Sequence, residues 1–339
     1  IMTQHTSTTS IQSWQSIISK YNKPRISHSV WQMINSLGPY FLIWILMVQT
    51  MKVSFWLTLP LMLLAAGFLI RIFIIFHDCG HGSFFRSKKL NFYIGSACGM
   101  LAFTPYHKWT DSHRAHHQTV GNLDKRGLGD VWTLTVDEYL ALSPFKRFSY
   151  RFFRHPAILL GIGGIAIFII GHRFTNRRMT EKQRLNVYAT NIIMFIAAAI
   201  ASWFIGWQAF LLIQLPVMYF ASIGGIYLFY LQHQYDEVYW CRDKDWDYLK
   251  MAMQGSSFFK LPGILRWFTG NIGFHHIHHL GPTIPNYNLP KCHKENSLFQ
   301  DVKPITFFES FKALGIRFWD EANQCAVGLR ELRRKRAAA

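Results

Sequence analysis

Long apolar stretches are the feature that most constrains how this sequence can fold. Crossing the hydrocarbon core of a bilayer takes about 20 predominantly apolar residues in a helix, and four stretches meet this requirement. Two cover residues 31–49 and 53–76, and the region 185–235 is long enough for two more, joined by a turn near Gly206 and Trp207. The sequence therefore predicts a polytopic membrane protein.

The charge distribution predicts an orientation. The chain has 36 Lys and Arg against 18 Asp and Glu, a net charge of +18. Such a charge alone suggests nucleic acid or anionic lipid as a partner, but the apolar stretches favour the membrane, and no nucleic-acid partner is expected. With four spans, the outer loops lie at 49–53 and 205–208 and contain one basic residue, Lys52. Because cytosolic loops carry the excess of Lys and Arg, the basic face is predicted to be cytosolic, in an integral, multi-pass protein of the cell membrane.

Two shorter apolar stretches, 91–105 and 157–171, have only about 15 residues each, a length typical of re-entrant or interfacial segments. If 157–171 crossed the bilayer, the basic cluster that begins at Arg173 would lie outside. We therefore predict that this stretch enters the membrane without crossing it. Arg71, near the end of the second span, is expected to extend toward the polar interface.

The predicted fold is an all-α membrane protein with about four transmembrane helices, re-entrant or interfacial helices and a cytosolic helical cap. We divide it into a polar N-terminal segment (1–30), a membrane domain (31–325) and a basic C-terminal tail (326–339). Residues 1–28 lack the apolar core of a secretory signal, so the first span is expected to be retained. The five scattered cysteines form no C-x-x-C pair, which excludes a disulfide scaffold or a thiolate zinc ribbon.

Histidines indicate the chemistry. The 16 histidines include one H-x-x-x-H and two H-x-x-H-H clusters, and positions i, i+3 and i+4 of a helix share one face. These eight residues are His77, His81, His113, His116, His117, His275, His278 and His279. All three clusters reach the cytosolic face if 91–105 does not cross and two spans lie within 185–235. His233, at the end of the fourth span, is a ninth candidate on that face.

Eight or nine imidazoles indicate a site for two metal ions in the cytosolic cap. Neutral imidazole suits iron, zinc and copper, and one tetrahedral zinc takes at most four ligands. Few thiolates or paired carboxylates accompany the clusters, which disfavours an iron–sulfur site. Redox-active iron with a position open to dioxygen is therefore the preferred metal. His276 lies between the ligands but would point away from their helix face. Six further histidines lie outside the clusters and are expected to be solvated or hydrogen-bonded: His5, His28, His107, His155, His172 and His293.

Three motifs give the sequence its resemblance to a known family. They are H-D-C-G-H-G-S-F-F (77–85), H-R-A-H-H (113–117) and G-N-I-G-F-H-H-I-H-H (270–279). The sequence resembles membrane fatty-acid desaturases of the bacterial and plant acyl-lipid type over about residues 30–325. The resemblance implies a di-iron (Fe2+/Fe3+) site held by the eight histidines of the clusters.

The resemblance also implies roles for residues near the clusters. His233 matches the extra histidine that such enzymes place after the last span. Related acyl-CoA desaturases have an asparagine one turn earlier, where this chain has Phe229. Asp78 and Asn271 are candidates for orienting a ligand imidazole from outside the ligand shell.

The implied activity is oxygen-dependent introduction of a cis double bond into acyl chains of membrane lipids held in an apolar tunnel, with dioxygen as co-substrate. No dinucleotide fingerprint, iron–sulfur ligand set or haem motif is found, so electrons are expected from an external donor. The basic face suits an acidic ferredoxin or flavodoxin, and equally anionic headgroups.

Three alternatives remain open from the sequence. A membrane hydroxylase or ketolase uses similar histidine clusters and would add oxygen to the product. A metal transporter would place ionisable ligands within the spans, whereas these clusters lie at span ends and beyond. A structural protein with incidental histidines would keep full activity after His116→Ala.

Overall fold

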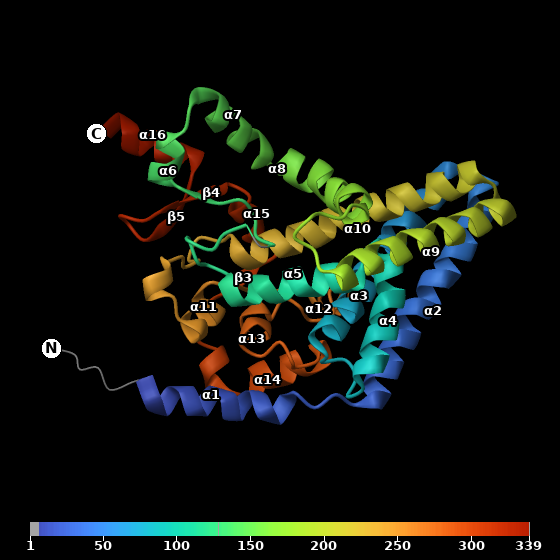
Figure 1. The fold of residues 1–339 in the computed structure, drawn as a ribbon, viewed down its shortest axis with the longest axis horizontal. Helices are drawn as coiled ribbons and strands as arrows, with labels where there is room; N and C mark the ends of the chain where they lie inside the picture. The colour runs from blue at the N-terminus through green and yellow to red at the C-terminus, as the bar shows by residue number, and fades with distance from the viewer. Residues whose placement is uncertain (1–6, 128, 339) are drawn as a thin grey trace.

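The computed structural model describes residues 7–127 and 129–338, which are mostly helical (Figure 1). Each of the four predicted spans forms one long helix: α2 (Ile26–Met51), α3 (Phe55–His81), α9 (Glu181–Ile205) and α10 (Trp207–His233). Figure 1 shows the α2–α3 turn and the α9–α10 turn at the same end of the bundle. The expected helical membrane architecture is confirmed.

A fifth helical segment is long and apolar enough to cross a membrane, one more than the four predicted. It runs over Pro156–Arg173, 18 residues, because the helix continues through His172 and Arg173 beyond the apolar stretch. It begins as α8 (Pro156–Ile158), continues through the π-helical turns η1 (Leu159–Gly163) and η2 (Ala166–Ile170), and ends in η3 (Gly171–Arg173).

The structure describes how this segment packs, and its course relative to a bilayer stays a prediction. It lies beside the middle of α10 (Figure 1), with Gly164 against Ser222 and Gly161 near the Tyr219 hydroxyl. Its C-terminal Arg173 donates to the backbone carbonyl of Phe103, in the turn before the helix that carries His113, His116 and His117. Arg173 also donates to Asn191 Oδ1 at 2.7 Å, in the middle part of α9.

The chain reverses direction at residues 82–87 and again at residues 102–105. Helix α4 (Lys88–Leu101) packs along the last turns of α3, and α5 (Tyr106–Thr119) returns beside it. The Tyr106 hydroxyl donates to the Cys79 carbonyl at 2.7 Å. A Cβ atom built on Gly95 would lie 2.4 Å from the Tyr106 ring and 2.8 Å from Cys79, so this close packing requires glycine.

Arg71 does not extend to the interface as expected. Its side chain is buried, because neighbouring helices supply neutral acceptors for the guanidinium. It donates to Ser36 Oγ at 3.0 Å and to the Trp267 carbonyl, and lies 3.9 Å from the centre of the Trp267 ring. Arg71 thereby ties α3 to α2 and to the short helix α12 (Gly263–Phe268).

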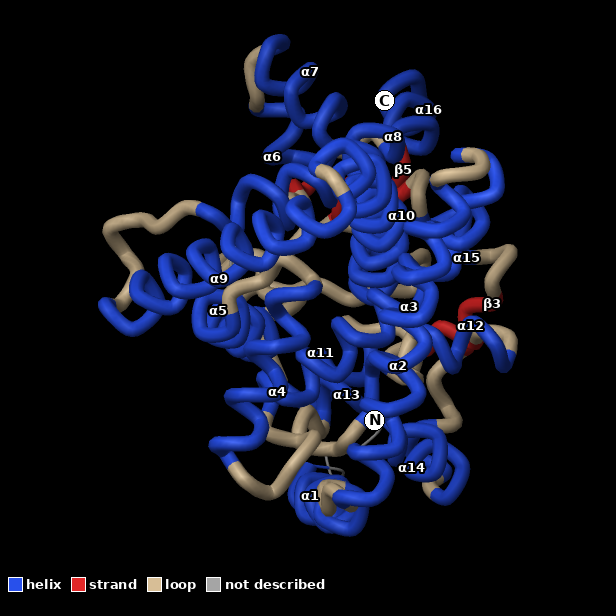
Figure 2. Tube along the Cα trace, turned by 90° about the vertical axis from the view of Figure 1, so that its right-hand side faces the viewer, coloured by secondary structure: helices blue, strands red, loops and turns tan. Residues whose placement is uncertain are grey.

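The cap on the histidine side consists of short helices and, unlike the prediction, two small sheets (Figure 2). One sheet has the order β1–β4–β5, with β1 parallel and β5 antiparallel to β4, and in the other β2 and β3 are parallel. The strands are β1 (Leu134–Thr135), β2 (Phe258–Lys260), β3 (Pro304–Thr306), β4 (Ile316–Asp320) and β5 (Cys325–Gly328). The remaining helices in the cap, besides α12, are α6 (Val136–Ala141), α7 (Pro144–Phe153), α11 (Tyr248–Gln254), α13 (His275–Leu280), α14 (Leu289–Glu295) and α15 (Ser310–Ala313), with the short 3-10 turns η4 (Asp243–Asp245), η5 (Asn286–Asn288) and η6 (Ser297–Phe299).

Both terminal segments pack on the cap. Helix α1 (Ser7–Tyr21) lies near α14, and the Tyr21 hydroxyl donates to Glu295 Oε2 at 2.7 Å. At the other end, the predicted C-terminal tail (326–339) does not begin as a tail. Its first three residues, 326–328, belong to β5, where Val327 is buried. The chain then continues as α16 (Leu329–Ala338).

The α4–α3 packing gives a stability prediction. We expect Gly95→Ala to destabilise the fold by about 1–3 kcal/mol, because the added methyl group overpacks the contact with Tyr106 and Cys79. Thermal unfolding of the detergent-solubilised protein measures the change. Gly38→Ala is the matched control, since a Cβ there has no neighbour within 4 Å; equal melting temperatures for the two variants would contradict the prediction.

Candidate metal centre

The nine histidines singled out in the sequence converge on one region from α3, α5, α10 and α13. Their ring nitrogens form two groups, each with its atoms within 4.8 Å of one another. The first group is His77, His81, His113, His117 and His278, and the second is His116, His233, His275 and His279. We call them the first and the second histidine cluster.

The spacing of the motifs explains how two adjacent clusters arise. On α5, His113 and His117 are one turn apart and enter the first cluster, whereas His116 enters the second. On α13, His278 belongs to the first cluster and His275 to the second. Each H-x-x-H-H motif therefore contributes to both clusters. α3 ends at His81, where Gly82 adopts a left-handed conformation with φ 71°.

The ring-nitrogen contacts in the second cluster fit a bound cation. His233 Nδ1 lies 3.0 Å from the Gly255 carbonyl oxygen, and His116 Nδ1 lies 2.7 Å from Asp130 Oδ1. Both oxygens are acceptors, so each Nδ1 carries the proton. A neutral ring then has only a lone pair at Nε2, yet the two Nε2 atoms are 3.0 Å apart. A metal ion held by the two Nε2 atoms would replace the repulsion between their lone pairs with two ligand bonds.

The first cluster has the same pattern. His113 Nε2 lies 3.0 Å from His77 Nε2 and 3.1 Å from His117 Nε2. His117 Nε2 is in turn 3.1 Å from His278 Nε2. One N–H can serve only one of these contacts, whereas a metal ion in the centre can serve them all.

Further ring nitrogens have no protein partner. Nε2 of His81 and Nε2 of His279 are buried without a hydrogen bond among the described residues. Leaving a buried polar atom unsatisfied costs about 1–3 kcal/mol. A metal ion in each cluster would satisfy these atoms, so the donor set fits two metal ions.

The surroundings keep the imidazoles neutral. Burial, followed by the proximity of other imidazoles, holds the pKa of His117, His275, His278 and His279 well below the ordinary value for histidine. Neutral imidazole is the form that binds metal ions. These four imidazoles are therefore in their ligating state at neutral pH.

Of the two residues expected to orient imidazoles, one is in position. Asp78 Oδ1 lies 3.2 Å from His77 Nδ1, and its Oδ2 accepts from the Asn286 backbone N–H at 2.7 Å. Asn271 does not contact an imidazole: its amide donates to the Asn286 carbonyl at 3.1 Å. The chain turns at Asn271 with φ 58°, which directs its side chain to the loop that holds Asp78.

The sequence analysis missed Asp130, the acceptor for His116. Its side chain is nearly buried, and its second oxygen, Oδ2, has no hydrogen-bond partner among the described residues. Asp130 follows Gly127 and Gly129, both with positive φ. The sequence signal for its role was an acidic residue after a glycine-rich turn, 14 residues beyond His116. The carbonyl of Gly255 had no signal in the sequence.

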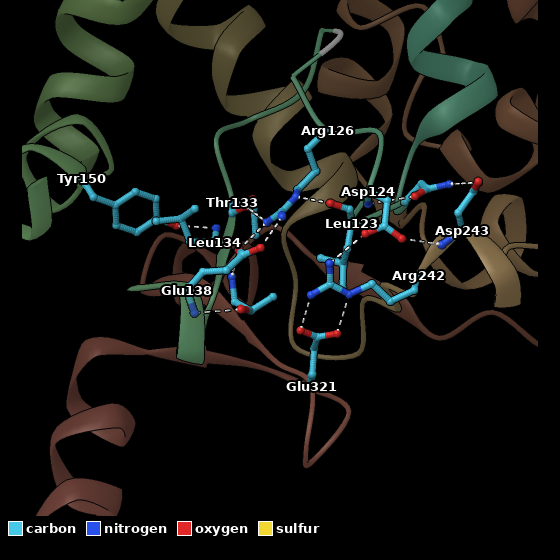
Figure 3. Close-up of polar contacts among 12 residues, drawn as sticks. Leu123, Asp124, Arg126, Thr133, Leu134, Glu138, Tyr150, Arg242, Asp243 and Glu321 are labelled. Atoms are coloured by element: carbon cyan, nitrogen blue, oxygen red, sulfur yellow. Dashed lines mark hydrogen bonds and ion pairs between the residues drawn. The ribbon is translucent and has the colours of Figure 1, made fainter. Parts of the chain in front are cut away.

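Charged side chains clamp the loop that carries Asp130 (Figure 3). Arg126 binds both carboxylate oxygens of Glu138, at 2.6 and 2.8 Å, and donates to the carbonyls of Leu123 and Thr133. Beside it, Arg242 binds both oxygens of Glu321 and also contacts Asp124, on the same loop. The two arginines fix the loop on both sides of its glycines.

The other described histidines lie outside the two clusters, and contrary to expectation His172 Nδ1 and His293 Nε2 are buried without a hydrogen-bond partner among the described residues. His276 is buried outside both clusters, with Nε2 3.2 Å from the Phe299 carbonyl oxygen. The ring of Phe229 lies 5.4 Å from the His116 ring, so this position is apolar. Outside the two clusters lie His28, His107, His155, His172 and His293. His5 lies outside the described residues.

An apolar cavity of about 340 Å³ leads to the clusters. It lies between α3, α10 and the Pro156–Arg173 segment, which supply Leu69, Phe73, Phe168 and Met218 to its walls. At its polar end it reaches histidines of both clusters, together with Asp130: His77, His113, His116 and His275.

The contact between Asp130 and His116 predicts a loss of metal. Asp130→Asn should weaken metal binding in the second cluster by about 10–100-fold, because His116 loses the charged acceptor that fixes its tautomer. Equilibrium dialysis followed by metal analysis measures this. The exposed Asp137→Asn serves as control, and unchanged binding in Asp130→Asn would show that the contact has no such role.

Comparison with known proteins agrees with the site. Residues 54–308 match the family described as fatty acid desaturase. A fatty acid desaturase of Bacillus subtilis (strain 168) is 43% identical over 316 residues, 93% of this chain and 90% of the relative. The sn-1 acyl-lipid omega-3 desaturase (ferredoxin) of Nostoc is 27% identical, over 80% of this chain and 75% of the relative. The acyl-lipid omega-3 desaturase (cytochrome b5) of the Arabidopsis thaliana endoplasmic reticulum is 29% identical, over 72% of this chain and 65% of the relative. With its paired histidine clusters at the end of an apolar cavity, the chain belongs to the fatty acid desaturase family.

Proposed function

We propose that this fatty acid desaturase acts on the acyl chains of membrane lipids, with two iron ions, dioxygen and electrons from an external donor. The observation that carries the proposal is the apolar cavity, which lies among lipid-facing helices and leads to both histidine clusters. An acyl chain in this cavity would have its methylene groups beside the ring nitrogens of the two clusters.

Each histidine cluster would hold one iron ion. The first has five imidazoles and the second four. Bound iron would supply the redox chemistry needed to attack an unactivated C–H bond. In the overall reaction, two hydrogens from adjacent methylenes, two electrons and two protons reduce one dioxygen to two waters.

The protein's own residues position and protect the site. Asp78, Asp130 and the Gly255 carbonyl hold Nδ1 of three imidazoles and so direct Nε2 inward. The apolar walls formed by Phe73 and Phe168 would exclude water and align the acyl chain. The cavity walls would thus choose which carbons lie beside the clusters.

Electrons would come from a small acidic protein of the ferredoxin or flavodoxin type. The net charge of +18 supports such a partner, and the names of two relatives specify ferredoxin and cytochrome b5 as donors. We also propose that the histidine end faces the cytosol and that the α2–α3 turn, with Lys52, lies outside. The helix lengths support a multi-pass arrangement.

Product analysis tests the reaction. In a host with known fatty acids, we expect expression of the chain to add a double bond to membrane phospholipids, located by mass spectrometry. His279→Ala should lower formation of the double bond by about a hundredfold or more. Removing a metal ligand should reduce activity at least as much as removing a group that only orients a ligand. The exposed His28→Ala is the control, and an added oxygen in place of the double bond would contradict desaturation.

The metal content tests the two-ion site. Protein purified anaerobically and loaded with iron should contain two ions per chain, and His233→Ala about one, because His233 belongs to the second cluster. Iron is measured by plasma mass spectrometry against protein from amino-acid analysis. One ion or none in the unaltered protein would overturn the two-iron proposal.

A further inference from the structure

Helix α7 exposes a row of aromatic side chains. Phe145, Phe148 and Phe152 are 76%, 59% and 46% exposed, and their spacing places them on one face of the helix. On another face, Tyr150 is fully buried, and its hydroxyl donates to the Arg317 carbonyl. Tyr150 therefore fixes the rotation of the helix, and the phenylalanines face outward because of how α7 is anchored.

Basic residues flank this aromatic row. Arg147 and Arg151 follow it on one side of the helix, and α7 contains no acidic residue. Helix α16 packs nearby, since Leu332 belongs to the same apolar group as Tyr150, and both helices lie at the same end of the molecule in Figures 1 and 2. The exposed basic residues of α16 are Arg330, Arg333 and Arg334. A helix with phenylalanines on one face and basic residues beside them is typical of a segment lying in the interface of an anionic membrane.

The aromatic surface continues toward the cavity. Half-exposed Trp132 has its ring 5.0 Å from the Tyr150 ring and 6.4 Å from that of Phe153, at the end of α7. Two residues before it, Asp130 lines the cavity beside His116. The surface therefore connects α7 with the cavity at the level of the second histidine cluster.

The same surface also continues into an apolar one. After α7 the chain passes directly into the Pro156–Arg173 segment, which is almost entirely unburied within the fold. This segment forms one wall of the cavity through Ile167 and Phe168. A docked soluble protein would match the basic residues but would leave this apolar surface in water, so a lipid bilayer fits the surface better.

We propose that α7 and Trp132 form a membrane-binding surface that guides an acyl chain of an anionic phospholipid into the cavity. The phenylalanines of α7 lie among the acyl chains of the nearer leaflet, and Arg151 contacts lipid phosphates, whereas Arg147 donates to the carbonyls of Leu140 and Leu142. An acyl chain then passes Trp132 to reach the histidines without leaving the membrane. This inference rests on the proposed function and specifies its substrate as a phospholipid within the bilayer.

The location of α7 is tested with full-length, iron-loaded protein in phosphatidylglycerol nanodiscs. A bimane label is attached to Phe148→Cys or to Lys146→Cys, which lies roughly 160° away around the helix, in a Cys325→Ser background. We expect doxyl-labelled phospholipid to quench the label at 148 and aqueous iodide to quench the label at 146. Quenching of both labels by iodide alone would overturn the inference.

Activity in the same nanodiscs tests the route. The double variant Phe145→Ser/Phe148→Ser should desaturate nanodisc phospholipid about tenfold more slowly than the unaltered protein, because α7 then buries less apolar surface in the leaflet and binds it more weakly. On a dispersed acyl substrate in micelles, the loss should be much smaller. Phe308→Ser, at another highly exposed phenylalanine, is the matched control.

The outcomes separate the two proposals. An equal loss in nanodiscs and micelles would mean general damage and would overturn the membrane-guidance role. If the unaltered protein forms no double bond on either substrate, the proposed function fails whatever the labels report. If it is active while the label at 148 is exposed to water, only the inference about α7 fails.

Discussion

The arrangement depends on one electrostatic constraint: nine imidazoles, most of them buried, point ring nitrogens at one another. His116 and His233 illustrate it, because both have their Nδ1 protons directed at oxygen acceptors and their Nε2 atoms 3.0 Å apart. Lone pairs at this distance repel unless a cation lies between them. The surrounding fold must therefore hold the rings against this repulsion, and a bound metal ion would stabilise the folded protein by removing it.

The framework that holds the rings is made of helices that meet at one end. Helices α3 and α10 reach the clusters with their C-terminal residues, while α5 returns beside α3 through contacts as close as that of Gly95 with Tyr106. Arg71 ties α3 to its neighbours inside the bundle through neutral acceptors. A shift of any of these helices by one residue would rotate its imidazoles away from the metal positions.

Periodicity and spacing in the sequence predicted the long helices and the nine histidines, because helix geometry is local. The partners of the imidazoles are not local. Asp130 reaches His116 across a glycine-containing loop clamped by Arg126, and Gly255 contributes only its backbone. Asn271 was misassigned because a positive φ turns its side chain toward Asn286. The small sheets of the cap were missed because their strands have only two to five residues, too few to show a periodic pattern.

The π-helical construction of the Pro156–Arg173 segment has a consequence for how such an enzyme can change. This wall of the cavity carries none of the nine clustered histidines, and its wide turns lack the regular i to i−4 hydrogen bonds of an α-helix. Substitutions there would alter one wall of the apolar cavity while α3, α5, α10 and α13 keep the arrangement of the histidines. One wall of the cavity can therefore vary while every clustered histidine is kept, whereas changes on α3 or α10 affect helices that supply both walls and histidines.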